Sequence, residues 1–74
     1  MKITIKNTSK IVEFNGIPAR IWEGETESGI KIHCFITRIM VNKDEPRIKE
    51  FHDELQIQNT PRSEIQAIPM KLII

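Results

Sequence analysis

The sequence is poor in the residues that usually stabilise or mark a small domain. Its 74 residues contain one cysteine, one tryptophan, three glycines and no tyrosine. Because a lone Cys34 cannot form an internal disulfide, and a chain of this size buries only about 60% of its unfolded surface, the fold needs another source of stability. We therefore expect association with a second copy of the chain, most simply as a dimer.

The chain also lacks a strong charge of either sign. It carries 11 Lys and Arg residues against 10 Asp and Glu residues, a formal net charge of +1. This balance gives no general attraction to nucleic acid or to an anionic membrane. No stretch approaches the roughly 20 apolar residues of a membrane span, and the opening MKITIKN has no apolar core like that of a signal peptide. We expect a cytoplasmic protein.

Motifs that would fix a chemistry are missing as well. No CxxC or HExxH pattern is present, and the glycines are too far apart for a phosphate-binding loop. Adjacent strand residues point to opposite faces, so His33 and Cys34 are not expected to form a metal or nucleophile pair. Glu23, Glu25 and Glu27 are interpreted as a solvated acidic rim. We predict a non-enzymatic protein without a cofactor or metal.

The regular apolar pattern predicts one small α+β domain over residues 1–74, with an antiparallel sheet of hairpins. Alternation in MKITIK predicts a strand over residues 1–6, NTSK a turn, and IVEF a second short strand. Asn15-Gly16 is typical of a tight hairpin turn. Pro18 cannot donate to a ladder, so the next strand is expected to begin near Ala19 or to run along an edge.

The longest predicted hairpin joins residues 19–25 to residues 30–41 through the turn TESG. If Glu25 pairs with Ile30, Trp22 lies opposite His33, although a slip of one residue would change every pair. One face of the hairpin then carries Ile17, Ala19, Ile21, Ile32, Cys34, Ile36 and Met40, and the other carries Arg20, Trp22, His33, Phe35, Thr37, Ile39 and Val41. Both faces are therefore expected to be apolar.

A principal helix is predicted over residues 46–57. NKDEP is a start signal in which Asp44 or Glu45 is the expected cap, and the helix carries one narrow apolar stripe. The stripe consists of Ile48, Phe51 and Leu55. Thr60-Pro61 predicts a single helical turn through Ala67, and MKLII a final strand. A narrow stripe can cover only one sheet face, so the other face needs a second copy, a ligand or a host protein.

The same hairpin offers a candidate ligand site. An Arg fork binds phosphate, an indole plane stacks on a base, and helix starts present free N–H groups to anions. The alternative is that Trp22 and Phe35 are core or interface aromatics with Arg20 at their edge, and that the other arginines are solvated. The predicted ligand-binding residues are Arg20, Trp22, His33, Thr37, Arg38, Arg47 and Arg62.

The run NGIPARIWEGETESGIKIHCFITRI, the charged helix after it and the closing AIPMKLII resemble small proteins encoded by tailed phages and prophages. The resemblance implies a non-enzymatic binder in the host cytoplasm. Such a protein would sequester a phosphate-bearing nucleotide immune signal at or near a subunit interface, as an anti-defence sponge. The alternative implication is an inhibitor that offers an uncovered apolar sheet face to a host protein.

Overall fold

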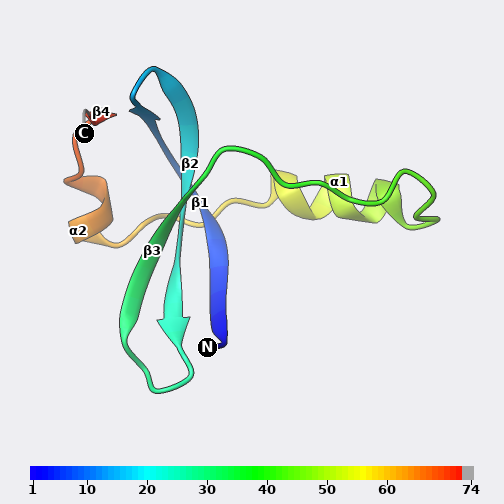
Figure 1. The fold of residues 1–74 in the computed structure, drawn as a ribbon, viewed down its shortest axis with the longest axis horizontal. Helices are drawn as coiled ribbons and strands as arrows, with labels where there is room; N and C mark the ends of the chain where they lie inside the picture. The colour runs from blue at the N-terminus through cyan, green and yellow to red at the C-terminus, as the bar shows by residue number, and fades with distance from the viewer. Residues whose placement is uncertain (73–74) are drawn as a thin grey trace.

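A four-stranded mixed sheet and two short helices make up the computed structural model, which describes residues 1–72 (Figure 1). The elements are β1 (Ile3–Phe14), β2 (Ile17–Thr26), β3 (Lys31–Ile36), α1 (Ile48–Gln56), α2 (Ser63–Gln66) and β4 (Lys71–Leu72). The strand order is β3-β2-β1-β4. The architecture is roughly α+β, with the sheet predominating. The antiparallel prediction is wrong for the last strand, because β4 runs parallel to β1; residues 73–74 lie outside the described part.

The first strand is continuous where a turn was predicted. NTSK lies within β1, whose pairing with β2 shifts between Asn7 and Ile11. The irregular stretch is hydrogen bonded to a distant residue: Ser9 N donates to Asn59 O at 3.0 Å, and Asn59 N donates to Asn7 O at 3.2 Å. The fully buried Thr8 hydroxyl lies 2.6 Å from Ile21 O and donates to it. The polar residues therefore form a bulge rather than a turn, because Asn59 and β2 supply their partners.

The Asn15-Gly16 turn is confirmed. Both residues have positive φ, 50° and 86°, as a two-residue hairpin turn of this kind requires. The second strand begins at Ile17, and Pro18 lies opposite Glu13. Because β3 pairs with β2 only from Arg20 to Glu25, Pro18 lies in a part of β2 that β3 does not reach. Its missing N–H therefore costs no ladder bond to that strand.

The pairing of β2 with β3 is one residue away from the predicted register. Trp22 lies opposite Cys34, and Glu23 lies opposite His33. The loop is shorter than expected: Thr26 N donates to Ile30 O at 3.0 Å, and Gly29 turns the chain with a φ of 91°. A three-residue loop closed by a left-handed glycine replaces the expected four-residue turn. His33 and Trp22 consequently point to opposite faces of the sheet.

One sheet face is packed against α2. Directly opposed and alternate residues share a face, which places the strand residues of the core on this side. The buried core side chains among the described residues are Val12, Ala19, Ile21 and Ile65, with Ile68 and Leu72 packed against the core, and Pro61 before α2 is buried as well. We call this side the α2 face. The other side, the open face, carries Ile3, Ile5, Arg20, Trp22, Ile32, Cys34 and Ile36.

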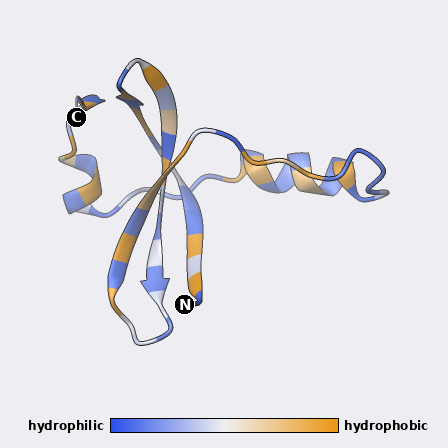
Figure 2. Ribbon diagram, viewed as in Figure 1, coloured by the Kyte–Doolittle hydropathy of each residue, from blue (hydrophilic) through white to orange (hydrophobic). Residues whose placement is uncertain are grey.

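The principal helix does not cover the sheet as expected. It occupies residues 48–56 within the predicted 46–57, buries none of its residues, and projects away from the sheet beside the segment that leads into it (Figure 1). The residue at its N-cap is Arg47, without a side-chain cap bond, so the predicted caps Asp44 and Glu45 are wrong. We call residues 38–57 the arm. Apolar and polar residues alternate around α1 within it (Figure 2).

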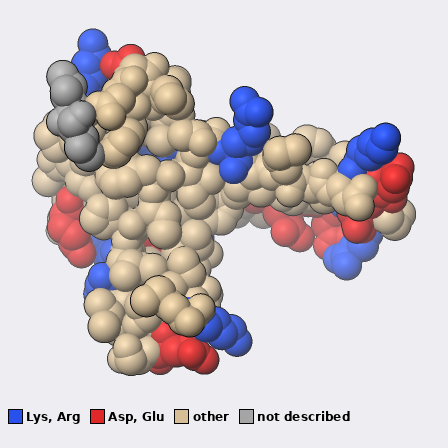
Figure 3. All heavy atoms as spheres, viewed as in Figure 1, with Lys and Arg blue, Asp and Glu red and all other residues tan. Residues whose placement is uncertain are grey.

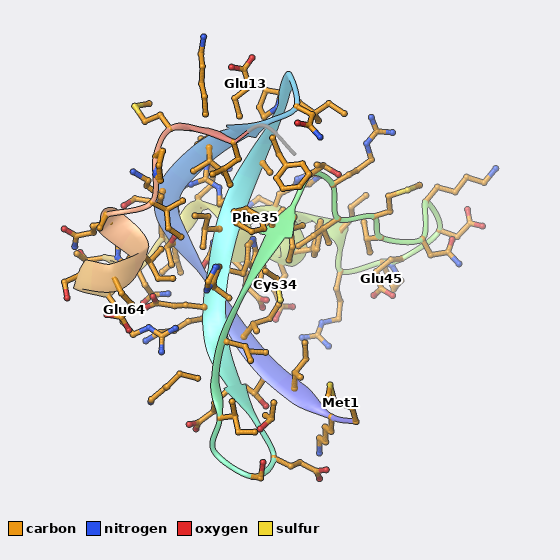
Figure 4. The ribbon with its side chains drawn as sticks, turned by 60° about the vertical axis from the view of Figure 1, so that its left-hand side comes forward. Met1, Glu13, Cys34, Phe35, Glu45 and Glu64 are labelled. Atoms are coloured by element: carbon orange, nitrogen blue, oxygen red, sulfur yellow. The ribbon has the colours of Figure 1, made fainter. Side chains whose placement is uncertain are left out.

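The far end of α1 is tied back to the sheet. Asn7 Nδ2 donates to Leu55 O at 3.2 Å. The chain then continues past the β1 bulge to α2, so the two helices lie on opposite sides of the strands (Figure 1). Figure 4 shows the same division, with Glu64 on α2 at one side and Glu45 on the arm at the other. Neither helix in residues 1–72 is long and apolar enough to cross a membrane.

Candidate functional site

A hollow of about 320 Å³ lies where the arm leaves the sheet. β2 contributes Arg20 and Trp22, the segment after β3 contributes Thr37 and Arg38, and the end of α1 contributes amide side chains. The complete lining is Asn7, Arg20, Trp22, Ile36, Thr37, Arg38, Ile39, Leu55, Gln56 and Gln58. We call this the arm-root hollow. It brings together four of the seven predicted ligand-binding residues.

Arg20 is positioned by the bulge of β1. Its side chain is half-buried, and Nη1 donates to Thr8 O at 2.8 Å. The position of the Arg20 side chain therefore depends on the bulge in β1, because the bulged backbone supplies the carbonyl that accepts from the guanidinium. A guanidinium has five N–H donors. One serves the fold, as the alternative interpretation expects, and the remaining donors are available to a ligand in the hollow.

The arm-root hollow has uncompensated positive charge. No carboxylate lines it, and neither Arg20 nor Arg38 forms an ion pair with any residue in the range 1–72. Three other hollows on the molecule each contain at least one glutamate. Because the arm-root hollow has no carboxylate and the other three hollows do, an anion is favoured in the arm-root hollow over the other three.

Trp22 lies on the floor of this region. It is half-buried on the open face, opposite Asn7 on one side and Cys34 on the other. The arm-root hollow and a neighbouring hollow both reach it. An indole that lines the same hollow as two arginines is a residue type suited to stacking of a planar ring that carries a negative group.

The remaining three predicted residues lie elsewhere. His33 is on the α2 face, where its ring centroid is 5.5 Å from that of Phe35 in an edge-on arrangement. Arg47 is exposed at the tip of the arm and pairs with Glu50, with Nε to Oε2 at 2.7 Å and Nη2 to Oε1 at 2.6 Å. This pairing raises the pKa of Arg47 and lowers the pKa of Glu50. The prediction that His33 shares a face with Arg20 and Trp22 is wrong, because the register is shifted.

Arg62 is engaged in a buried ion pair. Its backbone N donates to Glu23 Oε2 at 3.0 Å, its Nη2 donates to Ile32 O at 3.1 Å, and its Nε lies 3.3 Å from Glu23 Oε2 without the alignment of a hydrogen bond. Glu23 is only 4% exposed. The solvated acidic rim is therefore wrong for Glu23, although Glu25 and Glu27 are exposed. Arg62 anchors the segment before α2 to the sheet.

Sequence reasoning missed the amide groups of the hollow. Gln56 and Gln58 flank the end of α1, and Asn7 comes from the bulge. Nothing in the local sequence pointed to them, since their position depends on the path of the chain after the arm. Within residues 1–72, no three His, Cys, Asp or Glu side chains come together as a metal site.

Comparison of the chain with protein-family models, with curated proteins and with solved structures gives no match. The resemblance to phage proteins stays a prediction, and the function is argued below from the site itself.

Proposed function

We propose that this chain is a small binding protein that holds a phosphate-bearing nucleotide in the arm-root hollow. One observation carries the proposal: Arg20, Trp22, Thr37 and Arg38 converge on one hollow that no carboxylate lines. The combination matches the two parts of a nucleotide. Guanidinium groups bind phosphate bidentately, and an aromatic plane stacks on a base.

The residues divide into roles by their chemistry. Arg38 is the principal phosphate ligand, since none of its donors is taken by a residue in the described part of the chain, and Arg20 assists from its fixed position. The Thr37 hydroxyl adds a further donor. Gln56 and Gln58 carry both donors and acceptors, which suit the edge of a base. Trp22 supplies the stacking surface.

The dimensions favour a small ligand. At about 320 Å³ the hollow lies near the lower end of small-molecule sites, which span roughly 300–1,000 Å³. One nucleotide unit suits this volume, and a long oligonucleotide does not.

The proposed activity is binding without turnover. The lining of the hollow has no His, Cys, Asp or Glu, so it offers no side chain of the usual general-base type. A sequestering protein needs no such group, because removing a signal from solution requires affinity alone. This role agrees with the function that the phage resemblance implies.

Titration of nucleotides into the purified protein tests the proposal, with Arg38→Ala as the variant and Arg47→Ala as its matched control. Arg47 is an equally exposed arginine outside the hollow. We expect a nucleotide at 100 times its dissociation constant to stabilise the fold by about 2.7 kcal/mol. Arg38→Ala should weaken binding by at least about 10-fold, since a charged hydrogen bond contributes about 1.5–3 kcal/mol, and Arg47→Ala should leave it unchanged.

Two results would contradict the proposal. One is the absence of any thermal shift across mono-, di- and cyclic nucleotides; the other is an equal loss of binding in both variants. Mass analysis of the recovered nucleotide checks the non-enzymatic part, because a catalyst at substoichiometric concentration would convert it.

A second candidate function is inhibition of a host protein through the open face. It is favoured by the exposed apolar side chains there, among them Ile3 at 41% exposure. Ile3→Glu would then abolish inhibition of the purified target and leave nucleotide binding undisturbed. This candidate requires the open face to be free in the purified protein, which self-association would prevent.

A further inference from the structure

The chain exposes more surface than a compact protein of its mass. Its accessible surface is 5850 Å² for 8.6 kDa. The relation between surface and mass for folded monomers gives about 4,700 Å² at this mass. The excess of about 1,150 Å² exceeds the roughly 800 Å² that one partner buries in an interface of standard size. The surplus area is therefore enough for a stable dimer.

The arm protrudes from the rest of the molecule. Figure 3 shows the arm standing out from the body, with charged groups gathered at its tip. The stripe on α1 is left without a buried member: Ile48 is 37% exposed, and Phe51 and Leu55 are half-buried. An apolar stripe normally stabilises a helix by packing, and a nine-residue helix is marginal on its own.

A corner between the arm and the open face accompanies this protrusion. It encloses about 330 Å³ and is predominantly apolar in its surroundings. Its lining is Lys6, Asn7, Trp22, Ile39, Phe51, Glu54 and Leu55. Ile3 and Ile5 of β1 lie on the same open face as Trp22, further along the strand from the corner.

We infer that a second copy of this chain fills the corner, in a two-fold dimer in which each arm lies against the open face of its partner. A two-fold interface needs a surface that complements itself. This chain carries both parts, a protruding apolar arm and an apolar recess beside it. When each arm lies against the partner's open face, the apolar stripe of the arm and the open face are covered in both copies.

The small core explains why the occupant is a second copy rather than an occasional partner. The described residues bury only five apolar residues, the four core side chains and Pro61, which is little for a chain too short to bury much surface alone. A partner that supplies the additional buried surface must be available whenever the chain folds. A second copy meets this condition, because copies of the chain are made together.

Glu54 of α1 is the acidic residue that lines the corner, and it forms no ion pair with a residue in the range 1–72. Lys6 borders the corner as well, but it lies opposite Glu23, so its side chain belongs to the α2 face. The dimer also lies beside the arm-root hollow, since Asn7, Trp22, Ile39 and Leu55 line both hollows.

Sedimentation equilibrium without nucleotide tests the inference, so its outcome does not depend on the proposed ligand. We expect a dimer. Ile3→Glu should weaken it by at least about 10-fold, because a charge enters an apolar contact. The matched control is Ile17→Glu, in the same sheet but on the α2 face and more exposed, at 57% against 41%. This control should remain dimeric.

A change in the arm keeps the inference testable if Ile3→Glu does not fold. Ile48→Glu places a charge in the apolar stripe of α1, which buries no residue within one chain, so it should weaken the dimer. A monomer at about 100 μM would overturn the inference. So would a dimer that survives Ile3→Glu and Ile48→Glu, or one that Ile17→Glu dissociates equally.

Discussion

The two helices of this chain meet the sheet in opposite ways. α2 has four residues, yet it places Ile65 in the core at 1% exposure, and Arg62 before it pairs with buried Glu23. α1 has nine residues and an apolar stripe, yet none of its side chains is buried. Length and amphipathicity therefore do not decide which helix packs. The attachment of the flanking chain decides it, because Arg62 fixes α2 against the strands.

The largest difference between the regions should come from removing their apolar side chains. Ile65→Ala empties a position packed against Val12 and Ile21, and the expected loss is about 2–5 kcal/mol, enough to unfold a marginal domain. Ile48→Ala in α1 removes the same atoms from a side chain that is 37% exposed. At a protein concentration below the dissociation constant of the inferred dimer, where the arm is uncovered, it should cost much less. Urea denaturation followed by circular dichroism compares the two variants, and equal losses at that dilution would show that α1 is buried within the single chain.

The next difference should come from the two Arg–Glu pairs. Arg62→Ala removes the guanidinium and leaves the buried carboxylate of Glu23 with the hydrogen bond from the backbone N–H of residue 62. Because this bond remains and Arg62 is 26% exposed, we expect a loss of about 1–3 kcal/mol, below that of breaking a fully buried pair. Arg47→Ala breaks a pair of shorter distance that is exposed to water, and it should leave the melting temperature unchanged. Thermal denaturation of both variants measures the contrast. Equal shifts would contradict it.

A smaller loss of stability is expected from a change at Asn59, in the segment that joins α1 to α2. Asn59 Nδ2 donates to Asn7 O at 3.0 Å beside the bulge. Asn59→Ala removes this bond but keeps the two backbone bonds of Asn59, so the expected loss is about 1 kcal/mol. Gln58→Ala, its neighbour in the sequence, is the control. Faster hydrogen exchange at Ser9 N, whose acceptor is Asn59 O, should accompany the change.

The smallest effect concerns pH and is confined to the arm. The pKa of Glu50 is lowered by its hydrogen bond with Arg47. A lowered pKa in the folded state means that the contribution to stability is present above the ordinary glutamate pKa and is lost as the pH falls through the folded value. Carbon chemical shifts of α1 should then report reduced helicity in acid. Glu50→Gln should remove this dependence, and an unchanged profile in that variant would contradict the assignment.

Several elements could be predicted because their causes are local. Positive φ at Asn15 and Gly16 follows from residues that tolerate it, and the turn lies where the sequence indicates. The single helical turn after Thr60-Pro61 corresponds to α2, since proline favours a helix start. The apolar spacing over 46–57 likewise indicated α1.

The errors arose where a distant residue supplies a partner. NTSK has the composition of a turn, but it lies inside a strand because distant residues are its hydrogen-bond partners. Asn59 bonds to the backbone of Asn7 and Ser9, and Ile21 O accepts from the Thr8 hydroxyl. The register of β3 depended on one loop residue, and that slip separated His33 from Trp22. Glu23 looked solvated because its partner, Arg62, is 39 residues away.

The sequence by itself determined the parts of this protein that depend on near neighbours: alternating strands, the Asn15-Gly16 turn and the approximate positions of the two helices. Only the tertiary structure decided which charges are neutralised. Arg62 finds a carboxylate 39 residues away, while Arg20 and Arg38 meet in a hollow that lacks one. Composition cannot distinguish these three arginines, because the field at a guanidinium depends on the groups that the fold brings within a few ångströms of it.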